Sequence, residues 1–280
     1  MQFYQPPFIC NRGKFNILHK ILKLFPENIK YFMDIFSGTS SVGLNVKAET
    51  VVCLDSNIRI INLLSWLKAS GINETIHVLE SIVNEYHLSR DIGENLIKIN
   101  KEFYNTLKDE YNQLPDKDDF YANMMLLVLL AYNFNNQLRF KDGLYNVPIG
   151  NRSFSNSYSN KVRYFCNYVK DKNIHFIDKD FRDIGVETLN SNVFTYADPP
   201  VNFRYYNEQN TWTEQDDSDL FSFFNKINEK GLPFALSNVL EYKGNKNQNL
   251  YDWMEKYGYH YNIVSKRGDK IEVVVRNYKL

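Results

Sequence analysis

The chain has 280 residues, in which 33 Lys plus Arg balance 33 Asp plus Glu, and 15% of its residues are aromatic. This length suits one elaborated domain or a domain that carries a lobe, and the aromatic content argues against a disordered chain. A net charge of zero neither favours nor excludes a nucleic-acid partner, because acidic residues elsewhere can offset a basic cleft.

The cysteines and the N-terminal residues predict a cytoplasmic protein. Cys10, Cys53 and Cys166 lie far apart, and no Cys/His cluster accompanies them, so we expect neither a metal site nor disulfides. No charged segment followed by an apolar one begins the chain, which argues against a signal peptide. The longest apolar run, residues 124–132, is too short to cross a bilayer. We therefore expect no membrane partner and a cytosolic location.

The N-terminal quarter has the pattern of a strand–helix–strand unit. In chain order we expect a helix at 15–25, a strand at 31–36, a turn at 37–41, a helix from about Val42, a strand at 50–54 and a helix at 58–67. An acid, Asp55, follows the second strand. This order is typical of a Rossmann-type βαβ unit.

The rest of the chain has two parts. Residues 73–130 have mostly helical spacing, and residues 131–170, rich in Asn, Ser, Tyr and Arg, predict a long irregular binding segment. Alternation then resumes, with strands expected at 174–176, 193–196, 234–237, 260–264 and 271–275, and helices at 220–229 and 250–257. We therefore expect an α/β fold with a core of residues 1–72 and 171–280, into which a helical and loop-rich lobe, residues 73–170, is inserted.

Asp34, Gly38 and Asp55 form the first candidate site. A glycine turn lets the backbone approach a ligand, and an acid on the second strand can hold ribose hydroxyls. The chain has no G-x-G-x-x-G, and Asp34 would repel a pyrophosphate, which argues against a Rossmann oxidoreductase. A ligand with a free amino group and a cationic centre, such as S-adenosylmethionine, fits better. The alternative is an ordinary strand–turn–helix whose acid caps the helix.

The second candidate site is Asp198-Pro199-Pro200. It follows the apolar residues 193–196, so Asp198 should lie at the carboxyl end of a strand, where open α/β sheets bind ligands. Two prolines fix the backbone and withhold two N–H donors. The Asp198 carboxylate and the Pro199 carbonyl could both accept hydrogen bonds from one amino group and direct its lone pair toward an activated methyl group. The alternative is a strand-end loop stiffened by proline.

The third candidate site is the polar stretch from Phe134 to Gly150. Its amide and guanidinium side chains suit base edges and phosphates, and further cations and tyrosines follow it. The alternative is a solvated loop with a turn at Asp142-Gly143. Without the other two sites, we would prefer this alternative.

These three sites, in this order, resemble the Dam-type family of DNA adenine-N6 methyltransferases, and the resemblance covers almost the whole chain. Residues 135–150 are similar to the family's R-F-x-x-x-G-x-F/Y-N-x-P-x-G stretch, and Asp198-Pro199-Pro200 matches the start of its D-P-P-Y motif. Further matches are Gly13-Lys14, Asp34-x-Phe36-x-Gly38, Asp55, Asp180-Phe181, residues 236–238 and residues 272–278. The joint order of these motifs is more specific than any one of them.

The resemblance implies a Rossmann-like S-adenosylmethionine methyltransferase sheet with an inserted, mostly helical target-recognition lobe. It implies S-adenosylmethionine as cofactor, S-adenosylhomocysteine as product, and a cofactor site made of Asn11, Gly13, Lys14, Asp34, Phe36, Gly38, Asp55, Asp180 and Phe181. Asp198, Pro199 and Pro200 would bind adenine N6 of a base flipped out of the duplex. Double-stranded DNA would be the partner, with a cognate restriction endonuclease as a separate candidate partner. The DNA-binding residues would be Asn136, Arg139, Lys141, Asn146, Arg152 and Tyr206.

Two departures from the family pattern leave alternatives open. Ser40 stands where the family usually has a second glycine, which predicts a looser turn. Val201 stands where the family has an aromatic residue that stacks on the flipped base. Phe203, Tyr205 or Tyr206 would have to supply that ring. The alternatives are therefore a weakly active or inactive DNA-binding homologue, and an amino-methyltransferase with another target amine.

Overall fold

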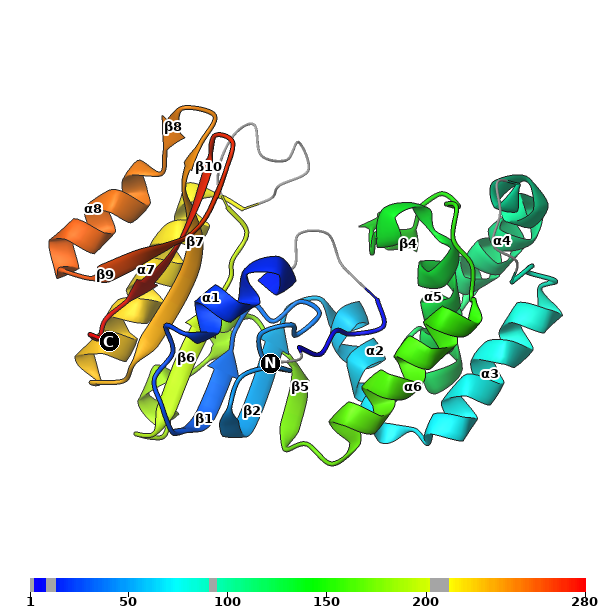
Figure 1. Ribbon diagram of the computed structural model, residues 1–280, viewed down its shortest axis with the longest axis horizontal. Coiled ribbons are helices and arrows are strands. Elements are labelled where there is room, and N and C mark those ends of the chain that lie inside the picture. Colours follow the sequence, from blue (N-terminus) through cyan, green and yellow to red (C-terminus); the bar gives the residue numbers. More distant parts are fainter. Residues whose placement is uncertain (1–2, 9–13, 91–94, 202–211) are drawn as a thin grey trace. The chain divides into compact units, whose positions relative to one another are not determined.

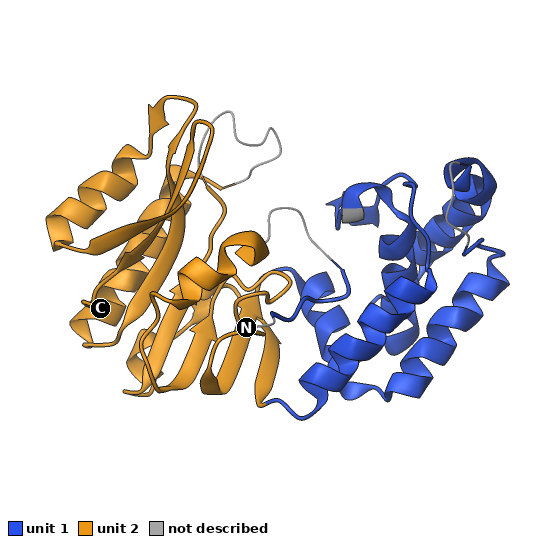
Figure 2. Cartoon of the chain, viewed as in Figure 1, with its two compact units in different colours: residues 1–13, 57–172 blue, residues 14–56, 173–280 orange. Residues whose placement is uncertain are grey.

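The computed structural model describes residues 3–8, 14–90, 95–201 and 212–280. The chain forms two compact units (Figure 2). Unit 1 consists of residues 1–13 and 57–172, and unit 2 consists of residues 14–56 and 173–280. These bounds differ from the expected 1–72 and 171–280, because the helix after the second strand packs among the helices of unit 1.

Unit 2 is built on one sheet (Figure 1). Its strands are β1 (Ile29–Asp34), β2 (Ala48–Asp55), β5 (Ile174–Asp178), β6 (Val193–Ala197), β7 (Phe234–Tyr242), β8 (Asn245–Lys246), β9 (His260–Arg267) and β10 (Lys270–Arg276). They are ordered β5-β2-β1-β6-β7-β10-β9, and β8 pairs with β7. The first five strands of this order are parallel, whereas β10 is antiparallel to both of its neighbours.

Helical segments complete unit 2 on both faces of the sheet. They are η1 (Lys14–Ile17), α1 (Leu18–Leu22), η3 (Phe181–Asp183), η4 (Val186–Thr188), α7 (Glu214–Glu229) and α8 (Gln248–Tyr257). Apolar residues of α7 and α8, among them Phe224 and Trp253, pack against Phe234 of the sheet. Phe25, which follows α1, packs against rings of β1 and β6. The fold is therefore the expected mixed α/β architecture with a mostly parallel sheet.

Strand order reverses at β1. This strand pairs with β2 on one side and with β6 on the other, and the chain reaches β6 only after β5 at the far edge. In open α/β sheets, ligands bind outside the carboxyl ends of the strands at such a point. Asp34 ends β1 in register with Cys53 and Tyr196, so Asp55 and Asp198 extend just beyond it along the neighbouring strands. The topology therefore gathers three acids at one edge of the sheet.

Unit 1 is mainly helical. Its elements are α2 (Ile58–Ala69), α3 (Ile72–Glu85), α4 (Leu96–Gln113), α5 (Phe120–Tyr132), η2 (Phe134–Asn136), β3 (Phe140–Lys141), β4 (Leu144–Tyr145) and α6 (Asn156–Lys170). Helix α5 is buried on every side from Ala122 to Tyr132, because α2, α3 and α4 all pack against it. Within the described residues, no helix is long and apolar enough to cross a membrane.

Two local predictions were wrong. Residues 38–45 form successive turns in place of the helix expected from Val42; the hydrogen bonds from Leu44 to Ser40 and from Val46 to Val42 close single turns, and β2 already begins at Ala48. Residues 156–170, expected to be irregular, form helix α6. Its buried residues Val162, Phe165, Cys166 and Val169 follow helical spacing, but the polar residues between them obscured that pattern.

Candidate functional site

Asp34 is a buried acid at the end of β1. Its side chain is 1% exposed, and its Oδ1 atom has no hydrogen-bond partner among the described residues. Burial raises the pKa of the Asp34 carboxyl, the nearby charge of Asp198 raises it further, and a hydrogen bond from the Phe36 backbone opposes both effects. An unsatisfied buried carboxylate is unfavourable unless a donor or a cation joins it. The position therefore suits a ligand that carries an amino group.

The turn after β1 is held by the acid at the end of β2. Gly38 has a φ angle of +49°, in the left-handed region that favours glycine. No atom lies within 4 Å of where a Cβ would stand, so this backbone conformation, not crowding, explains the glycine. The Gly38 N–H donates a hydrogen bond to Asp55 Oδ2 at 2.8 Å. Two residues that the sequence placed in one site are thus joined directly.

Asp198 belongs to a network of partly buried charges, and its own side chain is 24% exposed. Lys14 Nζ lies 3.2 Å from Asp198 Oδ1 and donates a hydrogen bond to Glu272 Oε1 at 3.0 Å. Lys270 Nζ donates to the same Glu272 oxygen at 2.9 Å. The resemblance placed Lys14 at the amino acid end of the cofactor, whereas its ammonium lies on the carboxylate of the expected reaction centre. The network therefore alternates in charge from Asp198 to Lys270.

The pKa values in this network follow from burial and pairing. Burial raises the pKa of Asp198, and the Lys14 ammonium opposes that rise. Burial acts on Glu272 in the same sense, but Lys14 and Lys270 outweigh it and lower its pKa to about 2. Lys14 is kept charged by the same two carboxylates, which raise its pKa against the effect of burial. Sequence reasoning missed a role for Glu272, although a lone acid between Ile271 and three valines was a usable signal.

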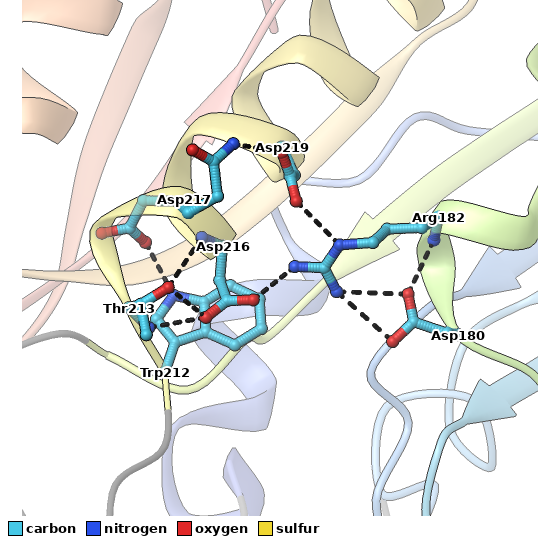
Figure 3. Close-up of polar contacts among 8 residues, drawn as sticks. Asp180, Arg182, Trp212, Thr213, Asp216, Asp217 and Asp219 are labelled. Atoms are coloured by element: carbon cyan, nitrogen blue, oxygen red, sulfur yellow. Dashed lines mark hydrogen bonds and ion pairs between the residues drawn. The ribbon is translucent and has the colours of Figure 1, made fainter.

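The segment after β5 is fixed by one arginine (Figure 3). The Arg182 guanidinium forms ion pairs with Asp180, at 3.3 Å, and with Asp216 and Asp219 near the start of α7. Asp180, expected at the cofactor's adenine, is therefore already engaged by Arg182. Sequence reasoning missed Arg182, whose contacts with α7 arise only through the tertiary fold.

An aromatic cluster lies beside this arginine. Phe181 is buried, and its ring centroid lies 5.3 Å from that of Phe36 and 6.2 Å from that of Trp212. Trp212 donates an indole hydrogen bond to the buried Asp217 at 2.8 Å. The expected pair Phe36 and Phe181 is thus brought together, and Trp212, which sequence reasoning missed, completes the cluster.

In unit 1, the third candidate site begins with a hairpin. Strands β3 and β4 are joined by Asp142 and Gly143, whose φ angles of 52° and 76° match a type I′ turn. Arg139 Nε donates to Asn146 Oδ1 at 2.9 Å, and its Nη2 donates to the Asn146 carbonyl at 3.2 Å. Lys141 is exposed on the hairpin. Two of the expected DNA-binding residues, Arg139 and Asn146, are therefore bound to each other.

Gly150 anchors the end of this hairpin region. Its N–H donates a hydrogen bond to the Tyr132 carbonyl at 2.8 Å. A Cβ at this position would lie 2.5 Å from the Asn133 carbonyl oxygen, closer than real Cβ contacts. The glycine is therefore required by close backbone approach, and it fixes where the polar stretch returns to the helices.

Arg152 follows this anchor and lines a cavity of about 230 Å³ in unit 1. Lys161 and the first residues of α6, including Ser155 and Ser157, line the same cavity. No Asp or Glu is among its lining residues, all of which are described. Arg152 is exposed and makes no ion pair among the described residues, so its charge is available to a partner.

Similarity to known proteins identifies the family of this chain. The family of D12 class N6 adenine-specific DNA methyltransferases matches residues 13–267, which is most of the chain. This chain belongs to that family. Its relatives include the type II methyltransferase M.FokI of Planomicrobium okeanokoites, which is 32% identical over 95% of this chain, and the modification methylase StsI of Streptococcus sanguinis, 32% identical over 99%. The modification methylase LlaI of Lactococcus lactis subsp. lactis is 28% identical over 95%.

The chain spans less than half the length of these curated relatives. It covers 42% of M.FokI, 43% of StsI and 42% of LlaI. The family assignment does not depend on the rest of those relatives. The matched residues run through both units and include the motifs of Asp34 and Asp198.

Methyltransferases of this family generally use S-adenosylmethionine, and the residues of unit 2 fit that molecule. The orphaned Asp34 oxygen suits its amino group, and the open space beside Gly38 leaves room for backbone approach. Asp34, Asp55 and Asp198 lie at the carboxyl ends of neighbouring strands, so acidic side chains that are compatible with a cationic sulfonium gather at this edge.

Some expected residues lie outside the described part of the chain. These are Asn11 and Gly13 of the cofactor set, Tyr206 of the DNA set, and the substitute aromatics Phe203 and Tyr205. The side chain of Asn136 is likewise not described.

Proposed function

We propose that this chain transfers a methyl group from S-adenosylmethionine to N6 of adenine in double-stranded DNA. The observation that carries the proposal is Asp198-Pro199-Pro200 at the carboxyl end of β6, beside the point where strand order reverses. Asp198 stands one strand away from Asp34 and its orphaned oxygen. This brings an amine-binding acid next to a position suited to an amino acid ligand.

The residues of the D-P-P turn would work by positioning. The Asp198 carboxylate and the Pro199 carbonyl would accept hydrogen bonds from the two N–H groups of one amine. Held in this way, the amine directs its lone pair at the reacting carbon, and alignment alone can account for a large part of a rate enhancement. When bound, S-adenosylmethionine supplies an electrophilic methyl group on a sulfonium. Lys14 occupies one oxygen of Asp198 and leaves the other for the amine.

The cofactor site would extend along the same edge of unit 2. Asp34 and Gly38 would hold its amino acid end, Asp55 its ribose, and Asp180 with Phe36 and Phe181 its adenine. By the family pattern, Asn11, Gly13 and Lys14 would also belong to the cofactor set. The hydrogen bond between Gly38 and Asp55 supports this assignment, because it fixes the turn beside the ribose position.

Unit 1 would be the target-recognition lobe. Lys141 lies on its hairpin, Asn136 and Arg139 precede the hairpin, and Asn146 and Arg152 follow it. Phosphate contacts from such cations would position the duplex, and amide groups would read base edges. The target adenine must leave the stack, which requires about a few kcal/mol. DNA as substrate implies a cytosolic reaction, and a separate restriction endonuclease with the same target is a candidate partner.

The test is methyl transfer from labelled S-adenosylmethionine to duplex DNA, with the modified base identified by digestion. We expect N6-methyladenine, and replacement of Asp198 by Ala should lower the rate by about 10³-fold. Binding of S-adenosylhomocysteine should change little. Asp178→Ala is the matched control, because Asp178 likewise lies at the carboxyl end of a parallel strand, β5, but is exposed and lies at the far edge of the sheet. Undiminished transfer by Asp198→Ala would refute the assigned role, and N4-methylcytosine as product would identify another target amine.

Val201 supports a second candidate, a weakly active or inactive homologue. Its side chain is only 9% exposed and packs against Val239 and Tyr242. Val201 therefore presents no ring to a flipped base, and stacking of this kind contributes about 1–3 kcal/mol. If the reaction lacks that contribution, Val201→Tyr should raise the rate, whereas Val201→Leu should not. Equal rates for the native chain and Val201→Tyr would rule out this explanation.

A further inference from the structure

Glu272 is a buried carboxylate in an otherwise apolar part of β10. The next three residues, Val273 to Val275, are fully buried, and the Glu272 side chain is 11% exposed. Removing a carboxylate from water is unfavourable unless it is paired and hydrogen-bonded. Glu272 meets that condition with two ammonium groups, those of Lys14 and Lys270. The pairing accounts for how the charge is tolerated, but it leaves open why the strand carries a charge there.

The sheet is irregular on both sides of Glu272. Glu272 pairs with Val239 of β7 and Ser265 of β9, and the ladder skips Leu240 on one side and Val264 on the other. Bulges of this kind re-aim side chains and are frequent next to active sites. The backbone is therefore adapted at the one acidic position of β10, which directs its carboxylate to Lys14.

Lys14 joins this acid to the reaction centre. Its ammonium lies 3.0 Å from Glu272 Oε1 and 3.2 Å from Asp198 Oδ1. Without Glu272, the flexible Lys14 side chain would have a single carboxylate to hold it. Lysine has a flexible four-carbon side chain with considerable rotamer entropy, so one partner fixes its ammonium group less well than two partners do.

We propose that Glu272 is a positioning residue that holds Lys14 on Asp198. Held by Glu272, Lys14 keeps Asp198 anionic and leaves the second oxygen of the Asp198 carboxylate for the target amine. Lys270 balances the second charge, so that the network adds no net charge next to the cofactor position. This inference rests on the proposed function, because it assigns Asp198 to the amine.

The direction of a pH shift separates this role from a simple charge effect. Asp198 is surrounded by Lys14 from η1, Glu272 and Lys270 from β10, Asp34 from β1 and Tyr196 from β6. If Glu272 acted only as a neighbouring negative charge, its removal would lower the pKa of Asp198. If it holds Lys14 in place, its removal releases the ammonium and raises that pKa. Activity should fall at low pH as Asp198 becomes protonated. The two roles therefore shift this acidic limb of the pH–rate profile in opposite directions.

The experiment compares the native chain with Glu272→Leu, Glu272→Gln, Lys14→Met and the double variant Lys14→Met/Glu272→Leu. Single-turnover methyl transfer is followed against pH, and the Asp198 carboxyl carbon is titrated by ¹³C NMR, assigned by its loss in Asp198→Asn. We expect Glu272→Leu to slow transfer by on the order of 10- to 100-fold and to move the acidic limb to higher pH. Glu272→Gln, which keeps an acceptor for Lys14, should recover part of the rate.

The double variant tests whether Glu272 acts through Lys14. If it does, Lys14→Met/Glu272→Leu should be no slower than Lys14→Met alone, because the second change has nothing left to hold. The inference would be overturned if the rate reductions of the two single variants multiplied in the double variant. It would also be overturned if the acidic limb of the pH–rate profile moved to lower pH in Glu272→Leu. The NMR titration needs no turnover, so it decides the inference even if the native chain transfers no methyl group to DNA. That last result would count against the proposed function alone.

Discussion

In unit 2 the charges at the sheet edge are at least partly buried and are paired with one another, whereas in unit 1 the cations of residues 139–152 make no ion pair among the described residues. Lys14, Asp198 and Glu272 are joined within about a hydrogen-bond distance. Arg152 and Lys141 are exposed, and Arg139 bonds only to Asn146. Paired buried charges fix a geometry in advance, as a reaction centre requires. Unpaired exposed cations remain available for phosphates, as a DNA-binding surface requires.

The largest expected effect is that of Gly150→Ala, which should disrupt unit 1 and spare unit 2. The added methyl would meet the Asn133 carbonyl at 2.5 Å, and relieving such a clash in a packed region costs about 3 kcal/mol. We expect a lower melting temperature, faster proteolysis within residues 57–172 and loss of DNA binding, with S-adenosylhomocysteine binding retained.

Gly185→Ala in unit 2 is the control for that change. Its φ of −70° is ordinary, and its nearest neighbour would be the Thr188 hydroxyl at 3.4 Å. If Gly150→Ala leaves unit 1 as stable as Gly185→Ala does, the role given to the close backbone approach is wrong. Loss of cofactor binding together with DNA binding would show that the two units do not act separately.

Two arginines of unit 1 should behave differently when each is replaced by Ala. Arg139→Ala removes two hydrogen bonds to Asn146, so we expect unit 1 to lose about 1–3 kcal/mol of stability as well as DNA affinity. Arg152→Ala should leave stability unchanged and reduce the slope of log binding constant against log salt by about 1. Chemical denaturation and DNA titrations at several salt concentrations measure both. Identical behaviour of the two variants would contradict the distinction between an engaged and an available cation.

The smallest effect concerns the turn of unit 2. Ser40 has a φ of +59°, a left-handed conformation that is unfavourable for a residue with a Cβ. Ser40→Gly should therefore stabilise unit 2 by about 1 kcal/mol, after allowance for the greater freedom of glycine in the unfolded chain. Thermal unfolding with and without S-adenosylhomocysteine measures it. A destabilised variant would mean that the Ser40 side chain has a packing role that outweighs its backbone strain.

The sequence was most informative where a single strand determined the outcome. Apolar runs predicted the strands of unit 2, and the acids that follow them, Asp34 and Asp198, come together because parallel strands end at the same edge. The family resemblance is confirmed by the match over residues 13–267. The turn at Asp142-Gly143 also formed as its residues indicated.

What could not be predicted depends on contacts between distant segments. Glu272 reaches Lys14 from the other end of the chain, and Arg182 bridges β5 and α7, so neither pairing has a local pattern. Ser40 shows the reverse case. In place of the family's second glycine it predicted a looser turn, and the structure gives Ser40 the positive φ of 59° that usually favours glycine. The roles given to individual cofactor and DNA residues remain predictions.

The insertion of unit 1 between β2 and β5 has a consequence for the loop that the sheet must close. These strands pair directly, although residues 57–172 separate them along the chain. With the insertion unfolded, closing so long a loop would remove much chain entropy before any contact formed. Helix α2 follows β2, α6 precedes β5, and the two helices contact each other within unit 1. A folded unit 1 therefore shortens the effective loop between β2 and β5, and we expect variants that unfold unit 1 to slow the pairing of these two strands.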